Sequence, residues 1–161
     1  MIEFAIYNVP VGGGGLAVSP MPGRTRHYRT DWQHLCAWRP DLVLTMTTQA
    51  ELDRKGAGTL GADLANAGIG WLHLPVADFG VPEGLDWDDV CCRVLETLAR
   101  NGRVLVHCFG GCGRSGMIVL RLMIASGEGP DAALARLRGI RPCAVETDAQ
   151  MAWATQDVLL P

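Results

Sequence analysis

The segment of the sequence richest in chemistry is His107-Cys108-Phe109-Gly110-Gly111-Cys112-Gly113-Arg114-Ser115-Gly116. Five residues separate Cys108 from Arg114, and three of them are glycine. Glycines let successive backbone amides turn toward one centre and form a cradle for a tetrahedral oxyanion. We therefore expect this loop to bind a phosphate group through Phe109, Gly110, Gly111, Cys112, Gly113 and Arg114.

The side chains around this loop indicate nucleophilic chemistry at Cys108. The planar, permanently charged guanidinium of Arg114 matches two oxygens of a phosphate. A helix that begins near Arg114 adds its dipole and unpaired amides, which favour a thiolate at Cys108. The Ser115 hydroxyl is placed to hydrogen-bond the sulfur and make it a better leaving group. We expect His107 to orient the loop without transferring protons. A buried core thiol is the alternative interpretation of Cys108, but packing alone requires neither the glycines nor the arginine.

These residues resemble the signature loop of the protein tyrosine and dual-specificity phosphatase superfamily. The resemblance is closest to the kinase-associated, cyclin-dependent-kinase-inhibitor type and covers about residues 15–155, including the segments 19–23, 138–139 and 144–147. It implies a protein phosphatase that hydrolyses phosphotyrosine through a phosphocysteine intermediate on Cys108, with phosphoserine and phosphothreonine as further substrates if the pocket is shallow. It implies no cofactor and no metal.

The segment 74–82 resembles the general-acid loop of the same family, with Asp78 in the position of the aspartate that protonates the leaving oxygen. General acid catalysis typically contributes about 10² to 10⁴-fold in rate. The alternative interpretation of Asp78 is a turn aspartate that accepts backbone hydrogen bonds, and Glu83 and Asp86 are substitutes for the acid role. In the second step, Asp78 would act as the base toward water.

The sequence departs from the family pattern at two positions. Cys112 stands where relatives carry an aliphatic residue or lysine, and Glu146 stands where glutamine is expected. Gln150 is an equal candidate for positioning water or for capping a helix. The sequence leaves open whether oxidation joins Cys108 to Cys112, to Cys143 or to neither, and we expect an inert packing role for Cys112.

Composition and charge limit the remaining choices. The chain has 161 residues with a net charge of −3, which predicts one domain over 1–161 and disfavours nucleic acid as a partner. No apolar run is long enough to span a membrane, and the N-terminus has no signal-peptide pattern, so we expect a cytoplasmic monomer. The six cysteines show no paired metal-binding spacing, which predicts reduced thiols.

Local patterns predict alternating strands and helices. Strands are expected over 2–6, 16–18, 41–45, 71–76 and 103–107, and capping boxes at Thr30–Gln33, Thr48–Glu51 and Thr147–Gln150 predict helix starts. Further helices are expected over 59–67, from Asp86 to about residue 100, from Arg114 to 125 and from Pro130 to about 139, and the last helix should continue through Val158. The sequence thus predicts an α/β fold, a mostly parallel sheet with helices on both faces.

Three other functions compete with a protein phosphatase. A sulfurtransferase also uses a cysteine in an anion loop, but it has no need of an acid such as Asp78. A lipid or inositol phosphatase usually needs more positive charge than residues 109–113 provide. A phosphoprotein-binding module would need the cradle but not the complete set of reactive side chains. A phosphorylated protein or peptide is therefore the expected partner.

Overall fold

The computed structural model describes residues 3–156 and is built around one five-stranded sheet. Its strands are β1 (Tyr7–Asn8), β2 (Gly15–Ser19), β3 (Leu42–Thr45), β4 (Gly70–His73) and β5 (Arg103–His107). They lie in the order β1-β2-β5-β3-β4, and only β1 is antiparallel to its neighbour. The predicted, mostly parallel sheet is confirmed, with β5 at its centre.

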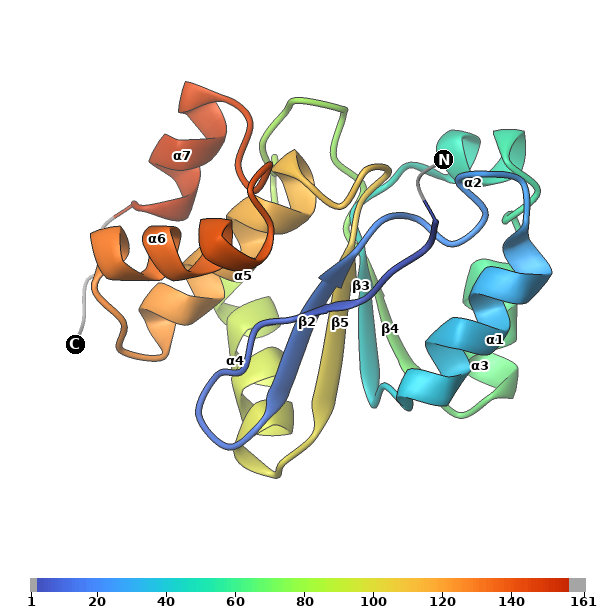
Figure 1. Ribbon diagram of the computed structural model, residues 1–161, viewed down its shortest axis with the longest axis horizontal. Helices are drawn as coiled ribbons and strands as arrows, with labels where there is room; N and C mark the ends of the chain where they lie inside the picture. The colour runs from blue at the N-terminus through green and yellow to red at the C-terminus, as the bar shows by residue number, and fades with distance from the viewer. Residues whose placement is uncertain (1–2, 157–161) are drawn as a thin grey trace.

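Helices cover both faces of the sheet, as predicted. Figure 1 shows α1 (Tyr28–Trp38), α2 (Gln49–Arg54) and α3 (Leu60–Asn66) on one side, and α4 (Trp87–Ala99), α5 (Gly113–Ala125), α6 (Pro130–Ile140) and α7 (Asp148–Ala154) on the other. Alternate residues of β5 serve the two layers, because strand side chains alternate between faces. Leu105 joins the core under α1–α3, whereas Val104 and Val106 join the core under α4–α7.

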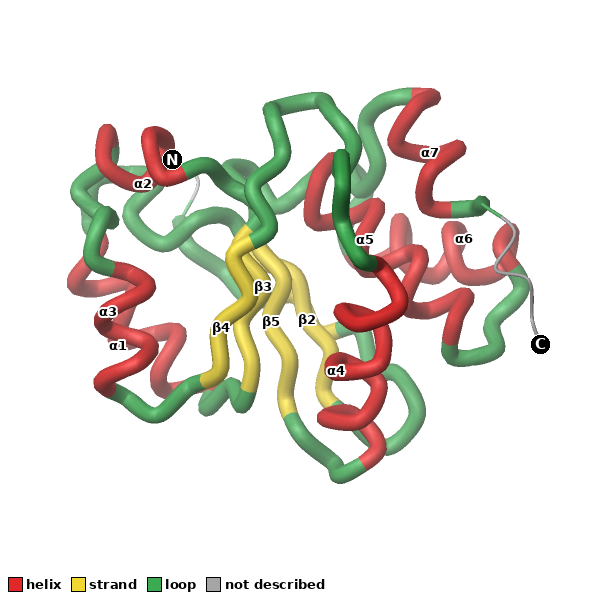
Figure 2. Tube along the Cα trace, turned by 180° about the vertical axis from the view of Figure 1, so that it is seen from behind, coloured by secondary structure: helices red, strands yellow, loops and turns green. Residues whose placement is uncertain are grey.

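The carboxyl ends of the parallel strands carry the loops in which the candidate site residues are predicted. Figure 2 shows these loops gathered at one edge of the sheet, between α2 and the first turn of α5. The loop after β5 leads into α5, and the loop after β3 leads into α2. This edge of a parallel sheet is where α/β proteins commonly place ligands.

Several helix boundaries follow the local signals in the sequence. The capping boxes at Thr48–Glu51 and Thr147–Gln150 are both formed. Asp86 caps α4 by accepting the Asp89 amide. The predicted box at Thr30–Gln33 is wrong, since α1 begins at Tyr28. Tertiary contact explains the earlier start, because the buried Asp31 side chain in the first turn accepts the Gly23 amide at 2.7 Å.

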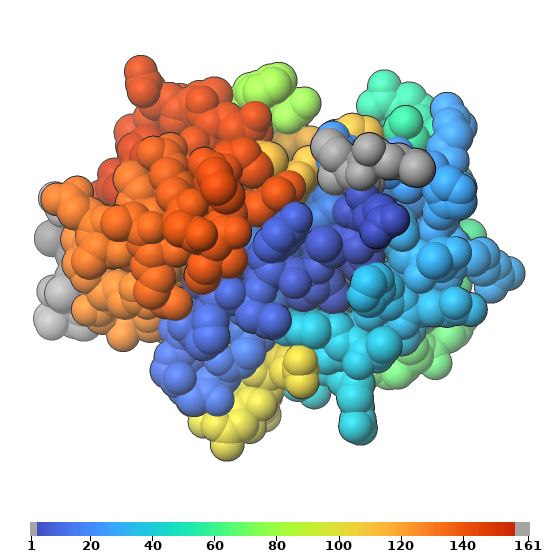
Figure 3. Space-filling model, in the orientation of Figure 1, coloured from blue at the N-terminus to red at the C-terminus, as the bar shows by residue number. Residues whose placement is uncertain are grey.

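The N-terminal strand is shorter and later than predicted. Residues 4–6 form no strand, Tyr7–Asn8 pairs with residues 17–18, and Ile2 lies outside the described residues, as does Val158 at the far end of the chain. The predicted strand 71–76 ends at His73. Figure 3 shows the N-terminal segment in contact with the region of α6, and a hydrogen bond from Arg136 to the Pro10 carbonyl joins them. No helix within residues 3–156 is long and apolar enough to cross a bilayer.

Candidate active site

Cys108 lies directly after the central strand β5, at the mouth of the glycine loop. Its side chain is nearly buried, and its Sγ lies 3.1 Å from the Ser115 Oγ. Ser115 is in the first turn of α5, so the same helix N-terminus faces the sulfur. The expected neighbours Cys108, Arg114 and Ser115 are therefore brought together.

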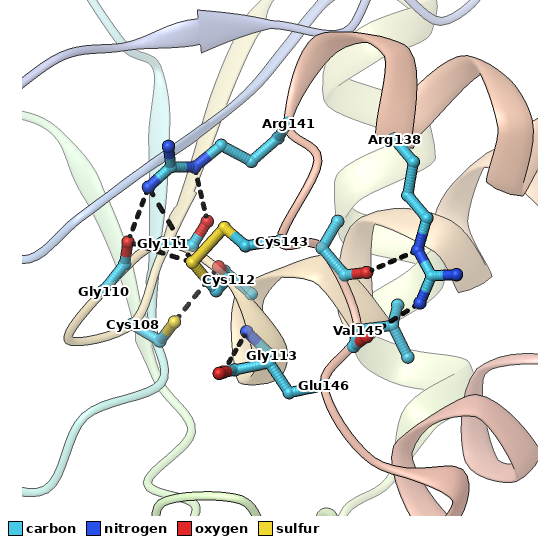
Figure 4. The surroundings of a disulfide bond; sticks show 12 residues. Cys108, Gly110, Gly111, Cys112, Gly113, Arg138, Arg141, Cys143, Val145 and Glu146 are labelled. Carbon is cyan, nitrogen blue, oxygen red and sulfur yellow. Dashed lines mark hydrogen bonds between the residues drawn. A yellow bond between two sulfur atoms is a disulfide. The ribbon is translucent and has the colours of Figure 1, made fainter.

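The backbone of the loop presents unused hydrogen-bond donors. Within residues 3–156, the amides of Phe109, Gly110, Gly111 and Cys112 donate no hydrogen bond to a protein atom. The carbonyls of Gly110 and Gly111 are instead occupied by Arg141, whose Nη2 and Nε lie 2.8 and 3.1 Å from them. Figure 4 shows the Arg141 guanidinium on the side of the loop where these carbonyls point. Fixing the carbonyls in this direction favours the opposite, inward direction for the amides that follow them.

One glycine of the loop cannot be replaced without strain. Gly111 has a φ of 70°, in the left-handed region, and a Cβ built on it would lie 2.7 Å from the Pro20 nitrogen. The backbone between β2 and α1 thus packs directly against the loop. Only glycine satisfies both the conformation and the close approach.

Arg114 is buried, and the carboxylate of Glu51 holds its guanidinium in place. Its two Nη atoms lie 2.8 and 2.9 Å from the two carboxylate oxygens of Glu51, and Nη1 also donates to the Val76 carbonyl. Burial alone would raise the pKa of the Glu51 carboxyl, but hydrogen bonds from Arg114 and Thr48 outweigh it, and the pKa is lowered. Burial likewise opposes the charge on Arg114, and the Glu51 hydrogen bonds reverse that effect and raise its pKa. The pair is therefore charged and oriented.

Asp78 reaches the same arginine from the loop that follows β4. Its Oδ1 lies 3.5 Å from the Arg114 Nη2, and its side chain is 57% exposed. The same oxygen accepts the Phe79 amide at 3.0 Å. Asp78 thus accepts a backbone hydrogen bond, as the turn interpretation predicted, and also lies at the candidate site. Among the two substitutes, Asp86 is occupied as the cap of α4, and Glu83 is exposed in the loop before it.

Gln150 and Glu146 lie behind the loop, and each already has partners. The fully buried Gln150 accepts the Glu146 amide and donates to the Gly80 carbonyl, which ties α7 to the loop of Asp78. Glu146 accepts the Gly113 amide at 2.8 Å. Gly113 thus offers its amide to Glu146 in this structure, whereas the four preceding amides have no partner in the part of the chain that the structure describes. The water-positioning role of Gln150 stays a prediction.

His107 is completely buried beneath the loop. Its Nε2 lies 2.7 Å from the Thr45 Oγ1, which in turn accepts the Trp71 indole N–H at 2.7 Å. Burial lowers the pKa of His107 to about 3, so the imidazole is neutral at physiological pH. A neutral, enclosed ring fits the expected orienting role.

A disulfide joins Cys112 to Cys143, and this corrects two expectations. Cys112 has no inert packing role, and the oxidised pair excludes Cys108, which is a free thiol. The bond ties the phosphate loop to the segment between α6 and α7, next to Arg141 (Figure 4). The expectation that all six cysteines are reduced is wrong for this pair. The sequence left the partner open because pairing depends on the spatial separation of the two Cα atoms.

Glu51 and Arg141 are site residues that sequence reasoning missed. The sequence pattern indicates only a capping-box role for Glu51. Its Oε2 does accept the Thr48 amide, and the same oxygen also accepts a hydrogen bond from Arg114. Arg141 carried no signal beyond its place after α6. Both residues reach the loop from at least 29 positions away, and local patterns do not encode such contacts.

Comparisons with known proteins agree with this geometry. The family described as "Polymorphic toxin system, DSP-PTPase phosphatase" matches residues 19–128. The human protein "Cyclin-dependent kinase inhibitor 3" is 30% identical over 122 residues, which cover 72% of this chain and 56% of the human protein. The chain thus spans about half the length of the curated relatives it matches.

Solved structures share the fold along most of the chain. Kinase associated phosphatase, in a form with its catalytic cysteine replaced by serine, superposes with a TM-score of 0.85 at 22% identity, covering 96% of this chain and 94% of that one. The active form of Tk-PTP gives a TM-score of 0.69 at 29% identity, with 86% and 87% covered. The family match covers the glycine loop, the loop of Asp78 and most of the sheet. The chain belongs to the DSP-PTPase phosphatase family.

Proposed function

We propose that this protein is a phosphatase that hydrolyses phosphotyrosine in proteins through a phosphocysteine on Cys108. The observation that carries the proposal is the convergence of one thiol, free amides and one guanidinium at the carboxyl end of β5. Cys108 Sγ lies at the base of the loop, and the amides of residues 109–112 have no protein partner among the described residues. A thiolate nucleophile and fixed donors for phosphoryl oxygens are the two requirements of this chemistry.

In the first step, the Cys108 thiolate attacks phosphorus and the bond to the leaving oxygen breaks. The loop amides and Arg114 hold the charge on the equatorial phosphoryl oxygens. Asp78 protonates the leaving oxygen, a role supported by its position 3.5 Å from Arg114 and by its exposed side chain. The products of this step are the free phenol and the phosphorylated cysteine.

In the second step, water attacks phosphorus and the thiolate leaves. Asp78, now a carboxylate, accepts the proton from this water, and inorganic phosphate is released. The Ser115 hydroxyl, 3.1 Å from the sulfur, stabilises the departing thiolate by a hydrogen bond. Gln150 supports this step through the loop of Asp78, to which it is hydrogen-bonded at the Gly80 carbonyl.

Phosphotyrosine is the favoured substrate because of the side chain that follows Asp78. Phe79 directly follows Asp78 in the chain and is 57% exposed, so the loop of Asp78 carries an aromatic side chain that is free to contact a substrate. An aromatic pair with the phenol ring contributes about 0.5–1.5 kcal/mol beyond its buried area. A serine or threonine phosphate cannot form this contact, although its phosphate fits the same cradle.

Hydrolysis of p-nitrophenyl phosphate by wild type, Cys108→Ser and Asp78→Asn tests the proposal. We expect turnover by wild type and no turnover by Cys108→Ser. Asp78→Asn should lose about 10² to 10⁴-fold in kcat with an alkyl or phenyl phosphate and less with the nitrophenyl ester, whose leaving group needs less protonation. Vanadate binding without hydrolysis by wild type would instead support a phosphoprotein-binding module.

A further inference from the structure

A pocket of about 430 Å³ opens next to the phosphate loop, and three of its six lining residues are cationic. It shares Glu51 and Asp78 with the candidate active site, and its remaining lining residues are Arg26, Arg54, Lys55 and Phe109. Arg24 completes the group, because its guanidinium lies over the Phe109 ring at 5.3 Å from the centroid. The Lys55 ammonium lies over the same ring at 5.7 Å. We call Arg24, Arg26, Arg54 and Lys55 the cationic rim.

Among residues 3–156, no member of the cationic rim forms an ion pair. Asp78 lines the same pocket, but its ion pair is with Arg114. Glu51 does not neutralise the rim, since both carboxylate oxygens are occupied by Arg114. The whole chain carries a net charge of −3, so this local excess of positive charge runs against the composition of the protein. Such an excess next to a catalytic cradle attracts anions.

The rim is assembled from two segments that are distant in sequence. Arg24 and Arg26 lie between β2 and α1, whereas Arg54 and Lys55 end α2. Bringing like charges together without counter-charge is unfavourable, and a solvated surface gains nothing from it. Both segments also hold the site itself, because Gly111 packs on the first and Glu51 lies on the second. The two segments that carry the rim therefore have a fixed position relative to Cys108.

We propose that the cationic rim binds a second phosphorylated residue of the peptide substrate. This inference rests on the proposed protein phosphatase activity. The rim lies beside the phosphate loop, since Arg24 and Lys55 both lie over the ring of Phe109, the loop residue that follows Cys108. A second phosphate bound there must belong to a part of the substrate that extends past this ring, which a neighbouring residue of a peptide chain can do. The arginine side chains of the rim would pair with this phosphate through two hydrogen bonds each, and the lysine ammonium would pair with it as a single positive charge.

Two matched peptides test the proposal, one with phosphotyrosine alone and one with an additional phosphoserine nearby. A set of the second kind, with phosphoserine at each position within a few residues on either side, covers both chain directions. We expect kcat/KM to be about five- to tenfold higher for the best doubly phosphorylated peptide, the effect of one or two exposed charge pairs. The preference should shrink as sodium chloride is raised from tens to hundreds of millimolar, because salt screens exposed charges.

Variants connect the preference to the rim. Lys55→Gln and Arg26→Gln should each reduce the ratio of kcat/KM values for the two peptides, and the double variant should bring it close to one. Arg100→Gln, which changes an exposed arginine at the end of α4, should keep the wild-type ratio. Binding to the Cys108→Ser protein by calorimetry gives the same comparison without turnover.

Four outcomes would overturn the proposal. Hydrolysis of the single phosphotyrosine peptide with no preference for any doubly phosphorylated peptide would reject the rim and leave the proposed phosphatase intact. A preference that survives in the Lys55→Gln, Arg26→Gln double variant would also reject it. Tighter binding of an inositol bisphosphate than of the best doubly phosphorylated peptide would assign the rim to a lipid headgroup. Hydrolysis of no peptide at all would remove the activity on which the proposal rests.

Discussion

Arg114 and Glu51 form a two-pronged ion pair across the site, with N–O distances of 2.8 and 2.9 Å between residues 63 positions apart. The pair joins the first turn of α5 to the first turn of α2. Because Glu51 also closes the capping box of α2, one carboxylate fixes both a helix start and the guanidinium that we propose to bind phosphate. The orientation of Arg114 is thus set before any phosphate binds.

Replacing Glu51 by glutamine should weaken phosphate binding. The Glu51→Gln side chain keeps its size but loses the charge that orients Arg114, so we expect kcat/KM for p-nitrophenyl phosphate to fall roughly tenfold. The vanadate inhibition constant should rise by a similar factor. Asp53→Asn, which changes an exposed acid on the same helix, is the matched control. Equal kinetics for Glu51→Gln and wild type would contradict a positioning role.

Arg141 should matter for the same binding step, although it lies on the outer side of the loop. In Arg141→Gln, the Gly110 and Gly111 carbonyls lose charged donors, and their peptide planes gain freedom to rotate. We expect KM and the vanadate inhibition constant to rise about three- to tenfold, the worth of one or two such hydrogen bonds. Arg39→Gln, at an exposed arginine after α1, serves as control. A fall in kcat with unchanged vanadate affinity would argue against this interpretation.

The Cys112–Cys143 disulfide should stabilise the folded protein. It closes a loop of sequence separation 31, for which loop-closure entropy corresponds to roughly 3 to 4 kcal/mol of unfolding free energy. Cys143→Ala should lose about this amount in urea unfolding without reductant, and dithiothreitol should destabilise wild type but not the variant. Cys92→Ala, at an exposed free thiol, is the control. If dithiothreitol does not change the urea midpoint of the wild-type protein, the disulfide is contradicted.

Acid should destabilise the protein through His107. Burial lowers its pKa to about 3, whereas the unfolded residue titrates near 6.5, so between these values only the unfolded state binds the proton. The free energy of unfolding should therefore fall as pH decreases from about 6.5 toward 3, with a limiting slope of about 1.4 kcal/mol per pH unit.

Urea titrations across this range measure the effect of His107. His107→Asn removes the titrating group and should flatten the profile above pH 4.5. The lowered pKa of Glu51 also makes the free energy of unfolding fall with decreasing pH. This contribution is lost only as pH falls below the pKa of an unfolded glutamate, because protonation then breaks the ion pair with Arg114. Identical slopes for His107→Asn and wild type between pH 5 and 6.5 would show that another group is responsible.

The parts of this protein that short sequence patterns describe were predictable. The strand Arg103–His107, the glycine loop, the start of α5 and the boxes at Thr48 and Thr147 depend on neighbouring residues, and all are present as predicted or within one residue. The box at Thr30 failed for a reason outside the pattern, because Asp31 bonds to Gly23 and α1 begins earlier.

The contacts that complete the site could not be predicted, because the fold creates them. Glu51 meets Arg114 because α2 and α5 follow adjacent strands β3 and β5 and begin at the same edge of the sheet. Cys143 meets Cys112 because α6 returns the chain to the loop. The rim on Phe109 likewise depends on where two loops converge.

Trapping the phosphoryl group on Cys108 during turnover tests the proposed mechanism most directly. Asp78→Asn protein, which lacks the base for the second step, is mixed with p-nitrophenyl phosphate and quenched in acid within one turnover. Mass spectrometry of the peptide that contains Cys108 should then show a phosphoryl adduct on this residue, in an amount that matches the burst of nitrophenol. Release of nitrophenol by this variant without any phosphoryl adduct on Cys108 would contradict the account.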